Sequence, residues 1–445
     1  MKILLVIDQF DADNNGTTIS ARRFAQALEN HGNEVRVVST GEEREGKYVV
    51  REWKIPFFDG LVKSQGMCFG RPDKKTLEEA IAWADIVHFP MPFALSFEGE
   101  KIASALGVPR TAAFHVQPEN ITSSIHMGNL RPLSTGIYRA FKKIFYDKFT
   151  HIHCPSEFIA GQLRKNGYQA KLHVISNGID PAFVYRRSQK RPAWEGRLVV
   201  LMVGRLSVEK RQDVLIDAVA KSKYADQIQL VLAGQGPRRA QLLERAKKLA
   251  HPPVVDFFQK EQLLDLMAES DLYVHAADIE IEAISCMEAF ASGLVPVIAN
   301  SDRSATPQFA LDERSLFVAG DSDDLARRMD YWFDHPDERA EMERRYAQQG
   351  ERYRIDRCVE KMEEMFREAI AEQPPRQDGG GYGDRTGTVA SQAACAAPDG
   401  PAPGRFAPDP PRPVPAPPPV SAPAPVPQVW QPLPGDPPAQ GEPGC

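Results

Sequence analysis

The strongest constraint on the fold of this chain is a set of short apolar segments without polar alternation. The segment 2–7 reads KILLVI, the segment 198–203 reads LVVLMV and the segment 295–298 reads VPVI. A strand that is covered on both faces has this pattern, and the helices on a parallel sheet provide such cover. Because potential helices follow these segments, the pattern predicts an α/β fold with parallel sheets.

The alternation of strands and helices begins twice, which indicates two domains. A chain of 445 residues is also too long for one ordinary hydrophobic core. The basic residues 181–197 predict a linker between the two runs. We therefore expect two Rossmann-like, doubly wound domains at 1–183 and 184–346. The expected strands are 2–7, 34–39, 86–89, 111–114, 151–154 and 172–175 in the first run, and 198–203, 228–233, 254–257, 272–275 and 295–298 in the second.

The composition changes near residue 373, since more than half of the 37 prolines follow it. Such a segment buries too little apolar surface to offset the entropy of ordering. Residues 373–445 are therefore predicted to be disordered or to form polyproline II. An inert tail is favoured over a docking segment for an SH3-like partner.

Charge and cysteine content exclude several classes of protein. The formal net charge is −6, and no chain-wide basic field argues for a nucleic-acid partner. The six cysteines form no C-x-x-C pair, which favours reduced thiols over disulfides or a zinc site. No apolar run reaches membrane-spanning length or resembles a signal peptide, so a cytoplasmic protein is expected.

The stretch 271–300 combines a strand, an acidic loop, a helix that begins near Ala283 and a second strand. Gly293 stands where a left-handed helix C-cap is expected. Glu288 lies among the apolar residues of this helix, and a buried carboxylate is costly unless it has a partner. A ligand at the mouth of the helix is the simplest partner.

The string EIEAISCMEAFASGLVPVIA at 280–299 resembles the E-x(7)-E signature of family 4 glycosyltransferases, which have the GT-B fold. The resemblance covers about residues 1–370. It implies that the two domains face a cleft. It also implies that a last helix at 347–370, within the segment 347–372, returns to the first domain.

The same resemblance assigns roles to the stretch 280–288. It implies that Glu280 contacts the transferred sugar and that Glu288 binds the ribose hydroxyls. Backbone donors at the start of the helix are expected to bind the donor. The residues concerned are Ala283, Ile284 and Ser285. Ile281 and Ala283 replace glycines of the family's EGFG motif, which leaves the identity of the sugar open.

Arg205 and Lys210 follow the strand 198–203 in the string GRLSVEK. The carboxyl end of a strand beside a helix N-terminus binds anions in doubly wound sheets, and two cations suit a diphosphate. These residues alone would favour a solvated surface pair. The string resembles the family's GRLxxEKG, however, whose Arg and Lys hold the donor diphosphate. Arg211 replaces the last glycine of that motif.

Three glycines and one histidine complete the predicted site. Gly234 and Gly236 resemble the family's G-x-G-P turn near the nucleotide, although a plain strand-to-helix turn is the default explanation. His115 ends the strand 111–114, where family members carry a histidine close to the sugar. Gly16 opens the first helix, where the family has a glycine-rich loop beside the donor phosphate.

Two other patterns of carboxylates were weighed. Asp11 and Asp13 spell a D-x-D, which binds metal in other glycosyltransferases, but here they are predicted to be solvated and no metal is expected. Glu280 and Glu288 could be a hydrolase pair. This is disfavoured because eight helical residues rise about 12 Å and hydrolytic carboxylates lie roughly 5–9.5 Å apart.

The helix 136–149 is amphipathic and basic. It can lie on anionic lipid, but a helix packed on the sheet is favoured. With the segments 55–71 and 120–135, it is expected to supply the acceptor surface. Its apolar face holds Ile137, Phe141, Ile144 and Phe145, and its basic residues are Arg139, Lys142, Lys143 and Lys148.

Within the family, the stretch 280–301 is most similar to bacterial diacylglycerol α-glucosyltransferases. This implies retaining transfer of glucose from UDP-glucose to a lipid hydroxyl such as diacylglycerol, without a tightly bound cofactor. It also implies a peripheral position on the inner face of the membrane. Three alternatives stay open: a soluble polyol or glycan acceptor, a GT-B sugar-nucleotide epimerase, and a non-catalytic nucleotide-sugar-binding protein.

Overall fold

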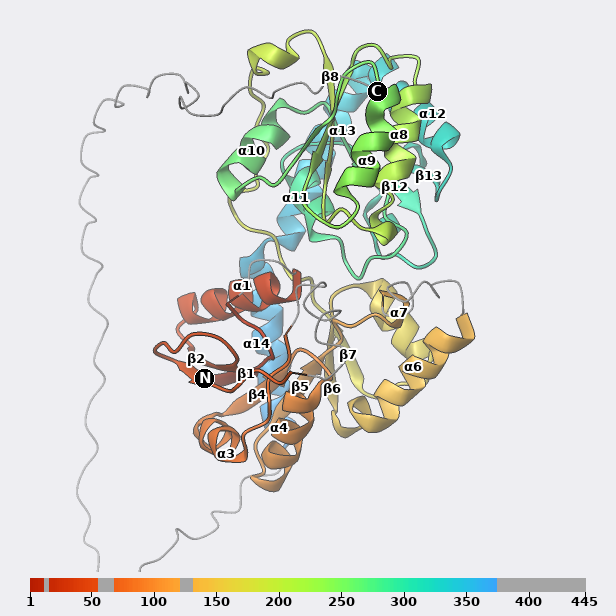
Figure 1. Cartoon of the computed structure of the whole chain (residues 1–445). Coiled ribbons are helices and arrows are strands. Elements are labelled where there is room, and N and C mark those ends of the chain that lie inside the picture. The colour runs from red at the N-terminus through yellow and green to blue at the C-terminus, as the bar shows by residue number, and fades with distance from the viewer. Residues whose placement is uncertain (12–15, 55–67, 121–130, 374–445) are drawn as a thin grey trace, which may run out of the picture. The chain divides into compact units, whose positions relative to one another are not determined.

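Two fully parallel sheets organise the described part of the chain, residues 1–11, 16–54, 68–120 and 131–373 of a computed structural model (Figure 1). The first sheet has the order β3 (Lys47–Val49), β2 (Glu34–Ser39), β1 (Lys2–Val6), β4 (Ile86–Phe89), β5 (Arg110–Ala113), β6 (His151–Cys154) and β7 (Lys171–Val174). The second has the order β10 (Val254–Asp256), β9 (Ile228–Ala233), β8 (Leu198–Val203), β11 (Leu272–His275), β12 (Pro296–Asn300) and β13 (Leu316–Val318).

Helices connect these strands, as the α/β prediction requires. The strand order reverses between β1 and β4 in one sheet and between β8 and β11 in the other. Ligands of doubly wound sheets bind at the carboxyl ends of strands beside such a reversal. The helices are α1 (Gly16–Asn30), α3 (Lys74–Trp83), α4 (Ala94–Ala105), α6 (Arg131–Ile144), α7 (Glu157–Lys165), α8 (Gln212–Lys221), α9 (Arg239–Arg245), α10 (Lys260–Glu269), α11 (Ile284–Ala291), α12 (Ser322–Asp334), α13 (Pro336–Gly350) and α14 (Ile355–Glu372).

Each sheet has an edge strand that the sequence did not predict. Strand β3 extends the first sheet, and β13 extends the second beyond β12, so the expected second run was incomplete. Both strands have three residues. A segment of three residues is too short to show a period, which explains why the pattern missed them.

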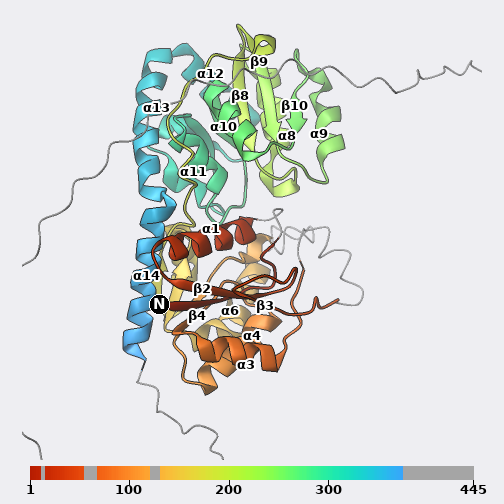
Figure 2. The same cartoon turned by 90° about the vertical axis from the view of Figure 1, so that its left-hand side faces the viewer.

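The last helix was predicted to begin at residue 347, but it begins later in the structure. Helix α13 ends at Gly350, a 3₁₀ turn follows, and α14 begins only at Ile355. A Cβ atom on Gly350 would lie 2.6 Å from the Cβ atom of Ala291, so α13 packs closely on α11. Helix α14 lies beside α1 (Figure 2), and its apolar side chains share a core with those of β1 and α1.

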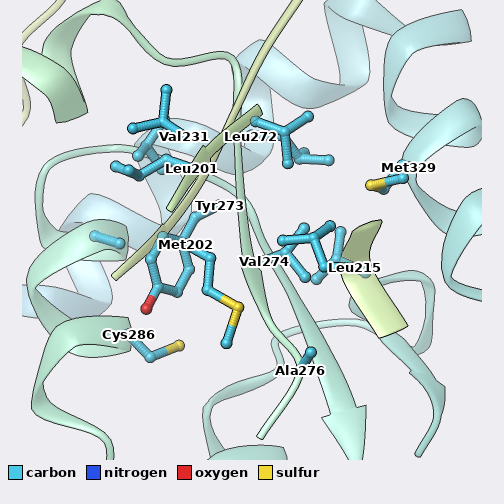
Figure 3. Packing of buried hydrophobic residues seen from close by; sticks show 14 of the residues in the cluster. Leu201, Met202, Leu215, Val231, Leu272, Tyr273, Val274, Ala276, Cys286 and Met329 are labelled. Atoms are coloured by element: carbon cyan, nitrogen blue, oxygen red, sulfur yellow. The ribbon is translucent and has the colours of Figure 1, made fainter. Parts of the chain in front are cut away.

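The core of the second domain forms around β8 and β11 (Figure 3). Leu201 and Tyr273 are fully buried there, as is Cys286 from α11. This confirms that α11 turns its apolar face to the sheet. Gly293 has a φ of +89° just after the helix, which is the left-handed conformation expected of a C-cap.

The basic segment 181–197 is packed on the second domain. Trp194 is buried in the core of that domain. The basic side chains of the segment form ion pairs with acids of the second domain, so their charge is neutralised locally. The pairs are Arg186–Asp265, Arg187–Glu343, Lys190–Asp271 and Arg191–Glu269.

Several predictions lie wholly or partly outside the described residues. These are the proline-rich tail beyond Gln373, most of the segments 55–71 and 120–135, and Asp13. Asp11 is described: its side chain is partly exposed, in line with the prediction that it is solvated, but it also has cationic partners. Its carboxylate lies 2.5 Å from the Lys47 ammonium and 3.5 Å from the Arg44 guanidinium.

Candidate active site

The predicted donor residues gather at the reversal of the second sheet. Arg205 and Lys210 follow β8, and Glu280 lies between β11 and α11. Strands β8 and β11 are neighbours, so their carboxyl ends bring both loops together. The sheet topology therefore explains why residues 70 positions apart meet.

Glu280 is the centre of a partly buried charged cluster. Its Oε1 atom pairs with the Lys210 ammonium and lies 3.1 Å from Nε2 of His275. Burial by itself would raise the pKa of Glu280, but the Lys210 charge and the His275 hydrogen bond outweigh it and lower the pKa to about 2. Glu280 is therefore a carboxylate at neutral pH and cannot supply a proton.

His275 was not predicted to belong to the site. It is the last residue of β11 and is buried. Its Nδ1 atom lies 3.2 Å from the Tyr273 hydroxyl, which donates to Ser285 Oγ at 3.2 Å. A polar residue at the carboxyl end of an apolar strand was the sequence signal that could have identified His275.

Gly234 and Gly236 are needed because two backbone segments touch. A Cβ atom at Gly234 would lie 2.0 Å from the carbonyl oxygen of Gly204, and one at Gly236 would lie 2.5 Å from that of Leu206. The Leu206 amide donates to the Gln235 carbonyl at 3.0 Å. This packing holds the loop that carries Arg205, whereas direct contact of the two glycines with a donor stays a prediction.

Two positions where this sequence departs from the family motifs have strained backbones. Arg211 has a φ of +54° and Ala283 a φ of +68°, the only positive φ values of non-glycine residues in the described ranges. A left-handed residue with a Cβ atom costs roughly 1–2 kcal/mol relative to glycine. Arg211 is held by Asp278 at 2.9 Å and Asp213 at 3.5 Å.

Glu288 has a protein partner that the sequence did not reveal. It is buried in α11, and its Oε1 atom lies 2.9 Å from Nη2 of Arg23 on α1. Burial raises the pKa of Glu288, and the Arg23 charge opposes that rise. A ligand was expected as the simplest partner of this carboxylate, and in the ligand-free protein Arg23 is its partner.

Glu282, a third carboxylate within the signature stretch 280–288, links the two domains by hydrogen bonds. It is buried and accepts hydrogen bonds from the Asn177 amide at 3.0 Å and from its side-chain nitrogen at 2.7 Å. Burial outweighs these bonds and raises the pKa of Glu282 to about 7. The Ser156 hydroxyl also crosses, donating to the Ile281 carbonyl at 2.7 Å.

His115 belongs to a separate, uncharged part of the molecule. It follows β5 and lines a cavity of about 20 Å³ together with His88 and His153. Burial lowers the pKa of all three histidines, to about 3 for His88 and about 4 for His153. Among the described residues, no hydrogen bond joins His115 to Lys210 or Glu280.

Gly16 begins α1, and a Cβ atom there would meet nothing within 4 Å. Packing in the described ranges therefore does not explain this glycine. Ile284 and Ser285 form the first turn of α11, and Ser285 Oγ donates to the Val203 carbonyl at 3.2 Å. Their backbone roles toward a donor stay predictions.

Helix α6 packs on the first sheet, which the sequence analysis favoured over a position on lipid. Tyr138 and Phe145 are buried in the core of the domain, whereas Ile144 is 55% exposed. Lys142 pairs with Asp147. None of the helices in the described ranges is long and apolar enough to cross a membrane.

Two family models match consecutive parts of the chain. The model for Glycosyltransferase Family 4 matches residues 14–183, and the model for Glycosyl transferases group 1 matches residues 185–351. Together they span more than half of the sequence. The chain belongs to the family 4 glycosyltransferases. It is a hexosyltransferase of the GT-B fold, so the predicted family, fold and reaction class are confirmed.

The named relatives of this glycosyltransferase differ in the sugar that their names give. It is 28% identical over 322 residues to an alpha-monoglucosyldiacylglycerol synthase of Streptococcus pneumoniae, covering 68% of this chain and 71% of the relative. It is 26% identical over 315 residues to a GDP-mannose-dependent alpha-mannosyltransferase of Corynebacterium glutamicum, covering 67% of this chain and 72% of that relative.

Solved structures show the same fold. Anabaena Alr3699/HepE in complex with UDP and glucose matches with a TM-score of 0.62 and 16% identity, covering 82% of this glycosyltransferase and 99% of that chain. Sucrose-phosphate synthase from Thermosynechococcus elongatus matches with a TM-score of 0.64 and 15% identity, covering 83% and 99%.

Proposed function

We propose that this glycosyltransferase moves a hexose from a nucleotide sugar to a lipid hydroxyl, with retention of the anomeric configuration. The cluster of Glu280, Lys210 and His275 carries the proposal, because it holds charged groups at the carboxyl ends of two neighbouring strands. Doubly wound sheets bind ligands at this position. Glucose and diacylglycerol are supported by the similarity to the alpha-monoglucosyldiacylglycerol synthase. UDP as the nucleotide of the donor is part of the proposal and comes from the family resemblance of residues 280–301.

The catalytic contribution proposed for this cluster is electrostatic. Arg205 and Lys210 would stabilise the charge that develops on the leaving diphosphate, together with the backbone amides at the start of α11. Lys210 already pairs with Glu280, so the cation is held in place before the donor binds. Glu280 would accept hydrogen bonds from sugar hydroxyls, because it stays ionised at neutral pH.

Glu288 is proposed to bind the ribose. Ribose hydroxyls would donate to this carboxylate, which Arg23 orients in the ligand-free protein. His115, near the acceptor side, would contact the sugar as a neutral imidazole, because burial keeps its pKa low. A hydrolase mechanism is not supported, because Glu280, with its low pKa, cannot act as a general acid.

The proposed acceptor surface lies on the first domain, and the protein would bind the membrane peripherally. On α6, Lys142 pairs with Asp147, and nearby Lys148 pairs with Glu100. Within the described residues no ion pair engages Arg139 or Lys143. These two residues, rather than the paired lysines, are expected to attract anionic lipid headgroups.

A donor-by-acceptor assay tests this function. Purified full-length protein would receive UDP-glucose or GDP-mannose with diacylglycerol in mixed micelles, with glycerol, or with no acceptor. We expect UDP release and an α-glucosyl lipid identified by NMR. A preference for GDP-mannose would change the donor assignment. Faster turnover of glycerol would identify a soluble acceptor. Conversion of the sugar nucleotide in the absence of an acceptor would identify an epimerase. Donor binding without any turnover would identify a binding protein.

The membrane part has its own test. The double variant Arg139→Glu/Lys143→Glu should bind vesicles with anionic lipid more weakly, and salt should weaken wild-type binding because surface charge is screened within about 10 Å at 0.1 M. Co-sedimentation measures both effects. The matched control Lys247→Glu/Lys248→Glu makes the same charge change on the second domain. Equal binding by all three proteins would refute a role of α6.

A further inference from the structure

A second cluster of titratable side chains lies away from the proposed active site, on the first domain. His151 is the first residue of β6, His173 lies on β7, and Glu368 and Glu372 lie one turn apart near the end of α14. The donor residues, by contrast, follow the carboxyl ends of their strands. The cluster therefore has no part in the proposed sugar transfer.

The ligand atoms in this cluster converge on one point. Nδ1 of His151 lies 2.9 Å from Nε2 of His173, and Oε2 of Glu368 lies 4.0 Å and 3.8 Å from these nitrogens. A tetrahedral ion with bonds of 2.0–2.1 Å holds its ligand atoms roughly 3.3 Å apart. The observed distances bracket that value, so small side-chain movements would complete three bonds.

The two imidazoles are in a form that can bind a metal. Their nitrogens face each other at 2.9 Å, which places at most one hydrogen between them. At least one ring is therefore neutral, as a metal ligand must be. His151 is fully buried and His173 is half-buried, so the position of both rings is fixed by packing on the sheet.

A carboxylate already orients the buried histidine. Nε2 of His151 lies 2.8 Å from Oε2 of Glu372, while its Nδ1 atom points to His173 and Glu368. Metal-binding histidines usually direct their second nitrogen to a carboxylate in this way, which fixes the ring and raises its basicity. Hydrogen bonding between two histidines alone would not require this additional partner.

We propose that His151, His173 and Glu368 form a binding site for one divalent metal ion, with Glu372 as the positioning residue behind His151. Two imidazole nitrogens and one carboxylate favour Zn²⁺, Co²⁺ or Ni²⁺ over Mg²⁺ and Ca²⁺, which prefer oxygen ligands. The ion would tie α14 to strands β6 and β7. Its role is structural, and it is independent of the donor and the acceptor.

Lys171 would compete with the metal ion for Glu368, which allows the proposal to be tested. Its ammonium lies 2.5 Å from Oε2 of Glu368, the same oxygen that the ion would use. Binding of the ion must displace this lysine or share the carboxylate with it. Removing the lysine charge should therefore tighten metal binding. If the cluster served only as an ion pair between Lys171 and Glu368, the same change would weaken the cluster instead.

The experiment titrates ZnCl₂ into EDTA-treated, full-length protein that carries no histidine tag, with a chromophoric chelator as competitor. We expect one saturable site per chain and a melting temperature that rises by about 3 °C or more with Zn²⁺. His173→Asn should lose this site, and Glu372→Gln should bind about tenfold to 100-fold more weakly. Lys171→Gln should bind about fivefold more tightly or better.

The control is His251→Asn, which changes an exposed histidine of the second domain and should behave as wild type. Co²⁺ in place of Zn²⁺ should give visible d–d absorption in wild type and in His251→Asn but not in His173→Asn. The proposal is overturned if wild type shows no saturable site, if His173→Asn binds Zn²⁺ as wild type does, or if Lys171→Gln binds it more weakly.

Discussion

The donor cluster around Glu280 and the histidine cavity around His115 are both largely shielded from water, but the ionisable groups in them are in opposite charge states. At the donor cluster, a cation lowers the pKa of Glu280 to about 2, so the site keeps its charges at neutral pH. At the cavity, burial lowers the pKa of His88 to about 3 and of His153 to about 4, so the rings stay neutral. Paired charge suits a diphosphate, whereas the cavity of about 20 Å³ between the neutral rings has room for about one water molecule.

Removing the cation from the donor cluster should have the largest effect. Lys210→Ala should lower kcat/KM for the donor by roughly 10²–10³-fold, because it removes a charge that faces the developing negative charge. Lys247→Ala, an exposed surface lysine, is the control. Steady-state kinetics at limiting donor measure the change, and a melting curve shows whether the variant is folded. Normal turnover by Lys210→Ala would mean that Lys210 does not hold the diphosphate.

Acid should destabilise the histidine cavity before it affects the donor cluster. Unfolded histidines take up protons below pH 6.5, whereas the buried His88, His115 and His153 stay neutral, so stability falls as the pH drops from 7 to 5. Glu282 acts in the opposite direction, because its raised pKa lets the folded state bind a proton first. Burial also raises the pKa of Asp8 to about 7, so Asp8 acts in the same direction as Glu282. Three losses of about 2 kcal/mol and two gains of about 2 leave a net loss of about 2 kcal/mol.

Chemical denaturation at pH 7 and pH 5 measures this loss. Glu280 should not contribute in that range, because its stabilisation is complete above the ordinary pKa of 4.5 and is lost only between pH 4.5 and about 2. His88→Gln should flatten the dependence, and His251→Gln should leave it unchanged. An identical pH dependence in His88→Gln and wild type would refute the buried, neutral state of His88.

The contact between the domains should have an intermediate effect. Arg23→Ala leaves the buried Glu288 without its cation, which should cost about 2 kcal/mol of unfolding free energy in the absence of donor. Arg164→Ala, which breaks an exposed pair with Glu157, should change stability by less than about 0.5 kcal/mol. The double variant Arg23→Ala/Glu288→Gln should be less destabilised than the sum of both single variants, and simple additivity would contradict the pairing.

Relieving the backbone strain should give the smallest effect, and it is a gain. Ala283→Gly should stabilise the protein by about 1 kcal/mol, because glycine tolerates the φ of +68° that alanine adopts there. Ala289→Gly, in the right-handed interior of α11, should destabilise it by about 1 kcal/mol or more. Urea denaturation measures both variants. A loss of stability in both would show that Ala283 is not strained.

Prediction from the sequence was most accurate for strands that have a neighbour on both sides in their sheet. The expected bounds of β2, β4, β6, β8, β9 and β11 agree with the structure at both ends. Continuous apolar runs define such strands without reference to partners. The edge strands β3 and β13 were missed because their stability comes from pairing with a neighbour rather than from their own pattern. The break after Gly350 was missed because only its contact with Ala291 explains it.

The sequence by itself determined the two parallel α/β domains, because apolar runs and their alternation with helices are local patterns. Its resemblance to the family 4 glycosyltransferases gave the family and the predicted roles of Arg205, Lys210, Glu280 and Glu288. The tertiary structure alone decided their partners. Arg23 meets Glu288 across 265 positions of the chain, and His151 meets Glu372 across 221. Such pairs leave no periodic signal, since their energy arises only when folding removes both groups from water.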